Sequence, residues 1–367
     1  MSTVKGGSDD IGYDVDTNTS ESIHSLKENL ATVVSEYLRC TAENMSSLKT
    51  FESDLANLVG ANRTERPSQT STDNTMMPSD SVFGGELRIS VTKPDAGPQL
   101  IAVETSFSIG CGNDTMLLIY QWKREAWQLT VRWQSGDYKE VSGAFGDFFK
   151  FVVLPRKETG EWLVVVAHGM PWCTSRWSGY DLDVIQPSSS GESQRLLAHK
   201  HSSYVRFDVD PTMKLVPGGF EIRLQTGQLD LAYMTHMGIY RYHVIDNELQ
   251  RVQPIAMNGR DFVDEWLQAD WSDAINWSAS AHLDNLQKVH ADVARRYAPN
   301  SGDNTLFSYG PVRGCAGDAK HFQVEFDRDS GSPTFFQIEQ GENSFSMLDA
   351  SSSSNPRCKG ADLMKKQ

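Results

Sequence analysis

From Gly85 onward, short runs of alternating apolar and polar residues are separated about every ten residues by Gly, Pro, Asp or Asn. A period of two indicates strands with one face buried, and turn residues at this spacing are typical of antiparallel meanders. The runs are 87–91, 100–107, 116–122, 127–133, 149–154, 162–167, 180–185, 204–209, 220–224, 239–245 and 249–255. The pattern predicts a mainly β fold.

Three of the runs begin alike at 60-residue intervals, at Tyr120, Tyr180 and Tyr240. Each tyrosine follows a Gly-rich or polar loop and precedes a polar turn and a further strand. Aligned on these tyrosines, units of about four strands each span residues 85–134, 145–200, 204–257 and, more weakly, 305–350. Tandem four-stranded antiparallel meanders form either a propeller-like arrangement or packed sheets, and both alternatives stay open at this point.

Two segments have helical periodicity instead. In the first, apolar residues recur every three or four positions at Ile23, Leu26, Leu30, Val33, Tyr37 and Cys40, and the pattern resumes at Leu48 and ends near Gly60. The stripe predicts one or two helices that either dock on the β body or self-associate with another chain, and the break near Asn44 favours docking. In the second segment, short helices are expected at 261–268 and 271–277, followed by a longer one at 283–297.

These patterns divide the chain into seven parts. The predicted parts are a disordered leader (1–20), an amphipathic helical segment (21–60), a Ser/Thr/Pro-rich linker (61–84), a β-meander body (85–258), a helical insert (259–300), a C-terminal β unit (301–350) and a disordered tail (351–367). All nine Trp lie between Trp122 and Trp277, so the core is expected in the middle of the chain.

The charge of the chain argues against two classes of partner. The formal net charge is −14, and no run of Lys and Arg exists that would follow nucleic-acid phosphates. An anionic membrane surface would repel such a chain. The longest apolar runs, such as 162–167, have the length of a strand, so no membrane span is expected and the chain is predicted to be soluble.

The N-terminal residues and the cysteines indicate in which cellular compartment the protein is expected. Met1–Asp10 is polar and has no apolar core of a signal peptide, which fits a cytoplasmic protein or a secreted or periplasmic one whose signal is not part of this chain. Two disulfides, Cys111–Cys173 and Cys315–Cys358 with Cys40 left over, would favour the second alternative. Five free thiols would favour the first.

The loop 168–181 is the strongest candidate for a ligand site. It concentrates aromatic rings beside charged groups, a combination that stacks on a sugar ring or holds an organic ligand. Its candidate residues are His168, Trp172, Arg176, Trp177 and Asp181. The structural alternative, in which both tryptophans cap the end of a sheet and Arg176 forms an ion pair with Asp181 or Asp183, remains the favoured one.

Other signatures of chemistry are absent from the sequence. No phosphate-binding Gly-rich loop, G-x-S-x-G, H-E-x-x-H or Cys-x-x-Cys motif exists, so no catalytic residue, metal or cofactor is predicted. His199 and His201 would share one face of a strand, which suits a metal, but no third ligand is identifiable.

Several stretches between about residue 100 and residue 358 resemble a group of uncharacterised, secreted bacterial β-rich proteins with no known activity. The resemblance is carried by the stretches 111–114, 118–122, 171–176, 242–246, 251–256 and 260–266. It implies an extracytoplasmic location and nothing about chemistry.

Two classes of function follow. The first is a non-catalytic, extracytoplasmic binding or interaction protein that presents the loop 168–181. The second is a hydrolase that acts on a saccharide or ester at a site built from loops. The missing motifs favour the first, and a pocket holding two carboxylates within ~10 Å would favour the second.

Overall fold

The computed structural model describes most of the chain. The described residues are 17–41, 47–61, 87–95, 99–109, 112–135, 148–156, 161–169, 176–188, 194–205, 209–230, 235–252, 256, 258–297, 307–327, 332–342 and 344–364. The chain divides into two compact units, residues 1–206 and residues 207–367.

The first unit contains two groups of four antiparallel strands, each in chain order. The first group consists of β1 (Arg88–Thr92), β2 (Leu100–Ile109), β3 (Gly112–Lys123) and β4 (Ala126–Gln134). The second consists of β5 (Phe149–Pro155), β6 (Trp162–Gly169), β7 (Trp177–Gln186) and β8 (Arg195–Val205).

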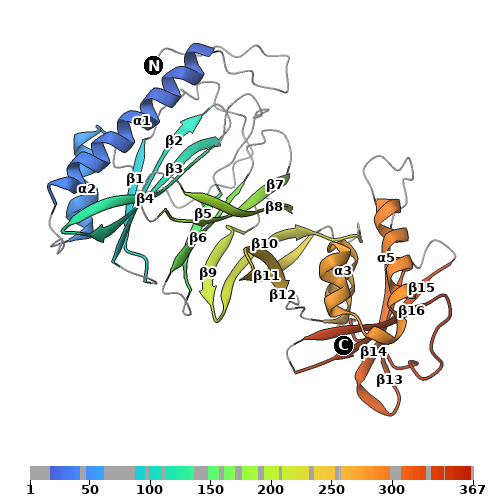
Figure 1. Cartoon of the computed structure of the whole chain (residues 1–367). Coiled ribbons are helices and arrows are strands. Elements are labelled where there is room, and N and C mark those ends of the chain that lie inside the picture. Colours follow the sequence, from blue (N-terminus) through green and yellow to red (C-terminus); the bar gives the residue numbers. More distant parts are fainter. Residues whose placement is uncertain are drawn as a thin grey trace. The chain divides into compact units, whose positions relative to one another are not determined.

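The β1–β4 sheet is buried on both faces, which makes the first unit three-layered. Leu117 and Ile119 of β3 face the β5–β8 strands, where they pack against Val164 and Val166. Met116, Leu118 and Tyr120 alternate with them and face two helices, α1 (Thr17–Arg39) and α2 (Leu48–Leu58) (Figure 1). Because both faces are covered, β3 is a nearly continuous apolar run. Packed sheets are therefore the arrangement inside this unit.

The helices dock on the sheet, the alternative that the break near Asn44 favours. The residues of α1 that are less than about a tenth exposed are Ile23, Lys27, Leu30, Ala31, Val34 and Leu38. The buried face of α1 is shifted from the predicted apolar stripe, since Val33 and Tyr37 are half-buried and Cys40 is an exposed free thiol. Lys27 belongs to this buried face because its ammonium group pairs with Asp114 of β3 at 3.1 Å.

The second unit contains two further groups of four strands. The first consists of β9 (Thr212–Val216), β10 (Gly219–Gly227), β11 (Thr235–Ile245) and β12 (Glu248–Val252). The second consists of β13 (Tyr309–Cys315), β14 (Asp318–Phe326), β15 (Thr334–Gln340) and β16 (Phe345–Ser351).

The predicted helical insert lies between these two groups of strands. Its elements are α3 (Gly259–Gln268), α4 (Trp271–Ala274), η2 (Ile275–Trp277), η3 (Ser280–His282) and α5 (Leu283–Tyr297). Helix α3 lies against the β13–β16 sheet (Figure 1). Phe262 and Trp266 of α3 pack into the core of this sheet. A Cβ at Gly259, the first residue of α3, would lie 2.5 Å from the side chain of Ile338. Glycine therefore permits the close approach of helix and sheet.

The expected fold class is confirmed: the chain is mainly β and is built of four-stranded antiparallel meanders. The three repeat tyrosines lie at equivalent places, since β3, β7 and β11 are each the third strand of their group. The predicted strand 204–209 overlaps the described structure only in part: Tyr204 and Val205 end β8, residues 206–208 lie outside the described residues, and the next described strand begins at Thr212. The run at 204–205 belongs to the end of β8.

The segment after β16 packs against β13, contacts that the expectation of a disordered tail did not anticipate. A disulfide joins Cys315 at the end of β13 to Cys358, and Cys358 is 1% exposed. Val312 donates its N–H to the Asp362 carboxylate and accepts a hydrogen bond from the N–H of Leu363. The leader up to residue 16, most of the linker, and both cysteines of the predicted disulfide between Cys111 and Cys173 lie outside the described residues.

Candidate functional site

Five ionisable side chains meet on one face of strands β6, β7 and β8. Register places His168 opposite Asp181, Asp181 opposite His201, and Asp183 opposite His199. Residues two apart share a face of a strand, so the two aspartates and three histidines form two adjacent rows. We call these five residues the His–Asp cluster.

Each carboxylate of the His–Asp cluster is held by imidazole rings. His201 places Nδ1 2.8 Å from an oxygen of Asp181, and His199 places Nδ1 2.8 Å from an oxygen of Asp183. His168 lies between the aspartates, with Nε2 3.4 Å from Asp183 and 4.0 Å from Asp181. The aspartate side chains are 13% exposed, whereas those of His199 and His201 are 51% and 58% exposed. The two carboxylates of the cluster are therefore largely buried, and the imidazole rings of His199 and His201 remain accessible to solvent.

Trp133 of β4 completes the cluster from the neighbouring sheet. Its indole N–H donates to Asp183 at 2.9 Å, and its ring lies 4.7 Å from that of His168. Burial alone would raise the pKa of Asp183, but hydrogen bonds from His168, His199 and Trp133 outweigh it and lower the pKa to about 2. The bond to Asp183 in turn raises the pKa of His199, against a smaller effect of burial. Asp183 is thus ionised across the physiological range.

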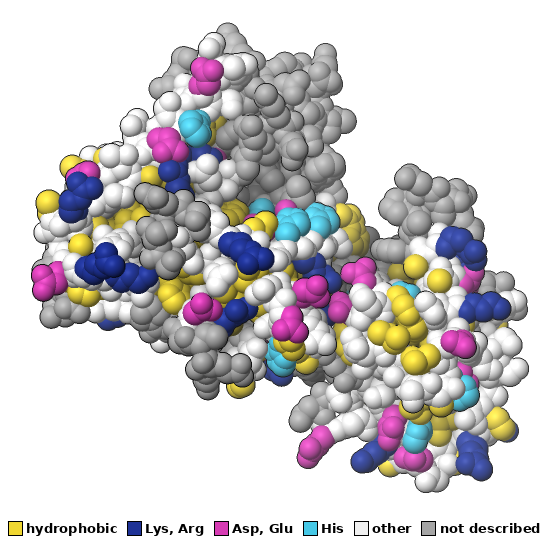
Figure 2. Space-filling model, in the orientation of Figure 1, with side chains coloured by type: hydrophobic (Ala, Val, Ile, Leu, Met, Phe, Trp, Pro, Cys, Tyr) yellow, Lys and Arg dark blue, Asp and Glu magenta, His cyan; other side chains and the backbone are white. Residues whose placement is uncertain are grey.

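The face of β7 that bears the aspartates continues to an exposed aromatic ring. Trp177, Gly179 and Asp181 alternate onto this face, and Trp177 is 44% exposed. Asp181 follows Trp177 by four positions along the strand, a distance of about 13 Å, and Gly179 between them has no side chain. Figure 2 shows histidines gathered over β7 and β8 at the surface. The result is a strip with an apolar ring at one end and charged hydrogen-bonding groups at the other.

The structure brings together some of the predicted site residues and adds others. His168 and Asp181 join the His–Asp cluster, and Trp177 lies on the same face, while Arg176 is exposed just before β7. Trp172 lies outside the described residues.

His199 and His201 do share a strand face, as predicted, but their pairing with Asp183 and Asp181 was missed. The hydrogen bond from Trp133 to Asp183 was missed as well. An Asp-x-Asp pattern at 181–183 facing a His-x-His pattern at 199–201 was the available signal. Reading it requires the register of β7 against β8, and periodicity alone does not supply that register.

No group of His, Cys, Asp and Glu among the described residues has the geometry to hold a metal ion. In the His–Asp cluster, the Nδ1 atoms that face the carboxylates are engaged in hydrogen bonds with them. The cluster is therefore suited to hydrogen bonding.

A second group of ionisable residues lies inside the second unit and has the character of a structural network. Glu265 of α3 accepts one hydrogen bond from Arg251 and pairs with His236 at 2.8 Å. Asp264 accepts from the hydroxyl of Tyr309 at 3.0 Å, and burial raises its pKa to about 7. The side chains of Arg251 and Glu265 are 9% and 7% exposed. These contacts join α3 to the strands and leave little access for a ligand.

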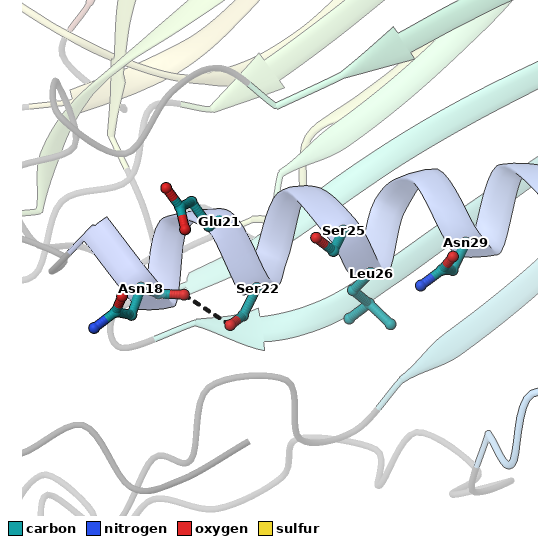
Figure 3. Close-up of a pocket in the computed structure, with 6 residues that line it drawn as sticks. All are labelled: Asn18, Glu21, Ser22, Ser25, Leu26 and Asn29. Atoms are coloured by element: carbon teal, nitrogen blue, oxygen red, sulfur yellow. Dashed lines mark hydrogen bonds between the residues drawn. The ribbon is translucent and has the colours of Figure 1, made fainter.

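A shallow hollow of about 550 Å³ lies along the first turns of α1 (Figure 3). Its described lining consists of Asn18, Glu21, Ser22, Ser25, Leu26 and Asn29. The hydroxyl of Ser22 donates to the backbone carbonyl of Asn18 in the same helix at 2.7 Å. The lining side chains come from one helix face and do not converge on a common point, so the hollow is a weaker candidate than the His–Asp cluster.

Comparison with known proteins finds no match to any family model, curated protein or solved structure. No helix in the described part of the chain is long and apolar enough to cross a membrane.

Proposed function

We propose that this protein is a non-catalytic, extracytoplasmic binding protein whose ligand is a saccharide held on the strip from Trp177 to the His–Asp cluster. One observation carries the proposal: an exposed indole, a position without a side chain and two carboxylates lie in line on one face of β7. An aromatic face stacks on the apolar face of a sugar ring, and carboxylate and imidazole groups bind its hydroxyls.

The ionisation of Asp183 supports binding over hydrolysis. A glycosidase needs one carboxyl group that stays protonated near neutral pH to protonate the leaving oxygen. The pKa of Asp183 is lowered to about 2 by its hydrogen bonds, so this group accepts hydrogen bonds and does not donate a proton. Three histidines around two aspartates thus provide fixed polarity.

Hydrolysis of an ester is the second candidate, and one observation favours it. His201 turns Nδ1 toward Asp181, which leaves Nε2 on the exposed side of the ring, as in the His–Asp pair of a catalytic triad. However, neither His199 nor His201 forms a hydrogen bond with a Ser, Thr or Cys side chain among the described residues. The nucleophile that this reaction requires is not in place there.

A panel of defined oligosaccharides separates the alternatives. We expect the full-length protein to bind at least one of them, measured by titration calorimetry, and to leave it intact after prolonged incubation, measured by mass spectrometry. Cleavage of the bound saccharide, or turnover of a chromogenic ester, would support a hydrolase. Binding to none of the panel would contradict the proposal.

The extracytoplasmic part of the proposal is supported by the Cys315–Cys358 disulfide, since such bonds persist in oxidising compartments. The resemblance to secreted bacterial proteins points the same way. Self-association through residues 21–60 is not part of the proposal, because the apolar face of α1 is already covered by the β1–β4 sheet.

The disulfide is checked by mass. Protein purified from its native source under thiol-blocking conditions should carry no label on Cys315 or Cys358 until it is reduced. Complete labelling of both cysteines without reduction would place the protein in a reducing compartment instead.

A further inference from the structure

A buried carboxylate surrounded by three cations lies in the second unit, on the face of strands β9–β11. The side chain of Glu221 on β10 is 0% exposed. One of its oxygens lies 2.7 Å from Nε of Arg223 and 3.2 Å from Nζ of Lys214, and the other lies 2.7 Å from Nε of Arg241. We call these four residues the Glu221 patch.

Strand register explains the arrangement. Glu221 pairs directly with Lys214 on β9 and with Arg241 on β11, while Arg223 follows two residues later on the same face of β10. Burial would raise the pKa of Glu221, but hydrogen bonds from Arg223, Arg241 and Lys214 dominate and lower it to about 2. The carboxylate is therefore a permanent anchor for the cations.

The cations exceed what one carboxylate requires. Three positive groups and one negative group leave an excess of two positive charges on this face, in a chain whose formal net charge is −14. Both arginines use only Nε to reach Glu221, and their terminal Nη groups form no hydrogen bond or ion pair with a described residue. The side chains of Arg223, Arg241 and Lys214 are 45%, 41% and 58% exposed.

This geometry leaves two guanidinium groups oriented by one internal partner and open to an external one. A guanidinium binds a tetrahedral oxoanion with paired N–H donors, and fixing its position in advance reduces the entropy lost on binding. We infer that the Glu221 patch binds the phosphate or sulfate group of a ligand through the Nη donors of Arg223 and Arg241, with Lys214 adding charge.

The inference is independent of saccharide binding at the His–Asp cluster, because the Glu221 patch belongs to the other unit. A role limited to neutralising Glu221 would leave the outer donors without a ligand. If the three cations bind an external ligand, a free oxoanion should bind saturably. If they only neutralise Glu221, it should not.

Isotope-labelled full-length protein provides the test. Arginine Nε–H signals are recorded while sodium phosphate and, separately, sodium sulfate are added, with ionic strength held constant by sodium chloride. We expect the signals of Arg223 and Arg241 to shift saturably, with a dissociation constant on the order of 1 mM. A stronger response to phosphate would indicate a phosphorylated ligand, and a stronger response to sulfate a sulfated one.

Two variants distinguish a shaped site from general attraction. Arg241→Lys keeps the charge beside Glu221 but loses the planar donor pair, so binding should weaken at least about tenfold. The double variant Lys288→Gln/Lys320→Gln removes two exposed charges of the same unit, on α5 and β14, and should bind as the unaltered protein does. No saturable shift, or equal weakening in both variants, would overturn the inference.

Discussion

At the scale of single residues, Asp183 determines the charge of the His–Asp cluster. Its carboxylate lies 2.8 Å from Nδ1 of His199 and accepts a hydrogen bond from the indole N–H of Trp133 at 2.9 Å. Nε2 of His168 lies 3.4 Å away. These bonds join β4 of one sheet to β6 and β8 of the other, so the charge also contributes to the stability of the first unit. A carboxyl group whose pKa is lower in the folded state stabilises the fold above its unfolded pKa.

The variant Asp183→Asn tests this contribution through its pH dependence. The folded pKa of about 2, against an ordinary value of 3.8, corresponds to about 2 kcal/mol in the free energy of unfolding at neutral pH. The stability difference between native protein and variant should be largest near about pH 5 to 6 and disappear as the pH falls toward about 2. It should also decrease as the pH rises through the raised pKa of His199, because the neutral imidazole interacts less with the carboxylate. Urea unfolding at a series of pH values measures it.

The variant Asp210→Asn is the matched control, because Asp210 is exposed and forms no ion pair with a described residue. It should change stability by less than about 0.5 kcal/mol at every pH. A difference for Asp183→Asn that persists unchanged down to pH 2 would show that the carboxylate charge is not what stabilises the cluster.

Side-chain chemistry of the site was only partly accessible from the sequence. His168, Trp177 and Asp181 stand out because aromatic and charged residues are concentrated in one short segment. Trp133 lies 35 residues before His168 and reaches it through sheet packing, a contact that no local pattern encodes. In the sequence, Glu221 looks like an ordinary solvent-facing residue of a strand. Its burial becomes visible only when β10 is paired with β9 and β11, which place Lys214 and Arg241 beside it.

At the scale of elements, α1 is fixed to its sheet by an ion pair inside an apolar interface. Lys27 contacts Asp114 at 3.1 Å and the backbone carbonyl of Ser135 at 3.2 Å. The side chains of Lys27 and Asp114 are 5% and 0% exposed. At the helix surface, Arg132 of β4 adds two hydrogen bonds to the carboxylate of Glu28. The buried pair fixes the register of the helix along the sheet.

Replacing one partner should be worse than replacing both. Lys27→Met removes the ammonium group that pairs with the buried carboxylate of Asp114 and should lower the free energy of unfolding by about 3 kcal/mol. In Lys27→Met/Asp114→Asn the buried carboxylate charge is removed as well, so the loss should be clearly smaller. Chemical unfolding gives the energies, and hydrogen exchange should show faster exchange in α1 for the single variant.

The control for this pair is Arg39→Met, which removes an exposed cation from the last turn of the same helix. Its loss should stay below about 1 kcal/mol. If the double variant is as unstable as Lys27→Met, the ion pair is not what holds α1 in place.

Element positions followed well from periodicity where burial is one-sided and less well where the chain changes units. The helix at 283–297 matches α5 to the residue, because its apolar spacing and the following Pro-Asn-Ser-Gly agree. The strand expected at 204–209 differs because β8 is mostly exposed or half-buried, so its residues do not alternate clearly. The α1 stripe shifted because Lys27 counts as polar in any hydropathy pattern.

At the scale of the whole molecule, the chain repeats one supersecondary unit and uses its copies differently. The first unit places helices on one copy and the His–Asp cluster on the next. The second unit places the Glu221 patch on one copy, and helices and a disulfide on the other. The repeat was visible in the sequence through its tyrosines, whereas the layer order was not, because it depends on which faces are covered.

The central claim is that the strip from Trp177 to the His–Asp cluster binds a saccharide. The most direct measurement is the dissociation constant of the tightest-binding oligosaccharide of the panel for native protein, Trp177→Ala, Asp181→Asn and the control Asp210→Asn. We predict that the first two variants bind at least about tenfold more weakly and that the control is unchanged. Equal affinity in all four proteins would contradict the claim.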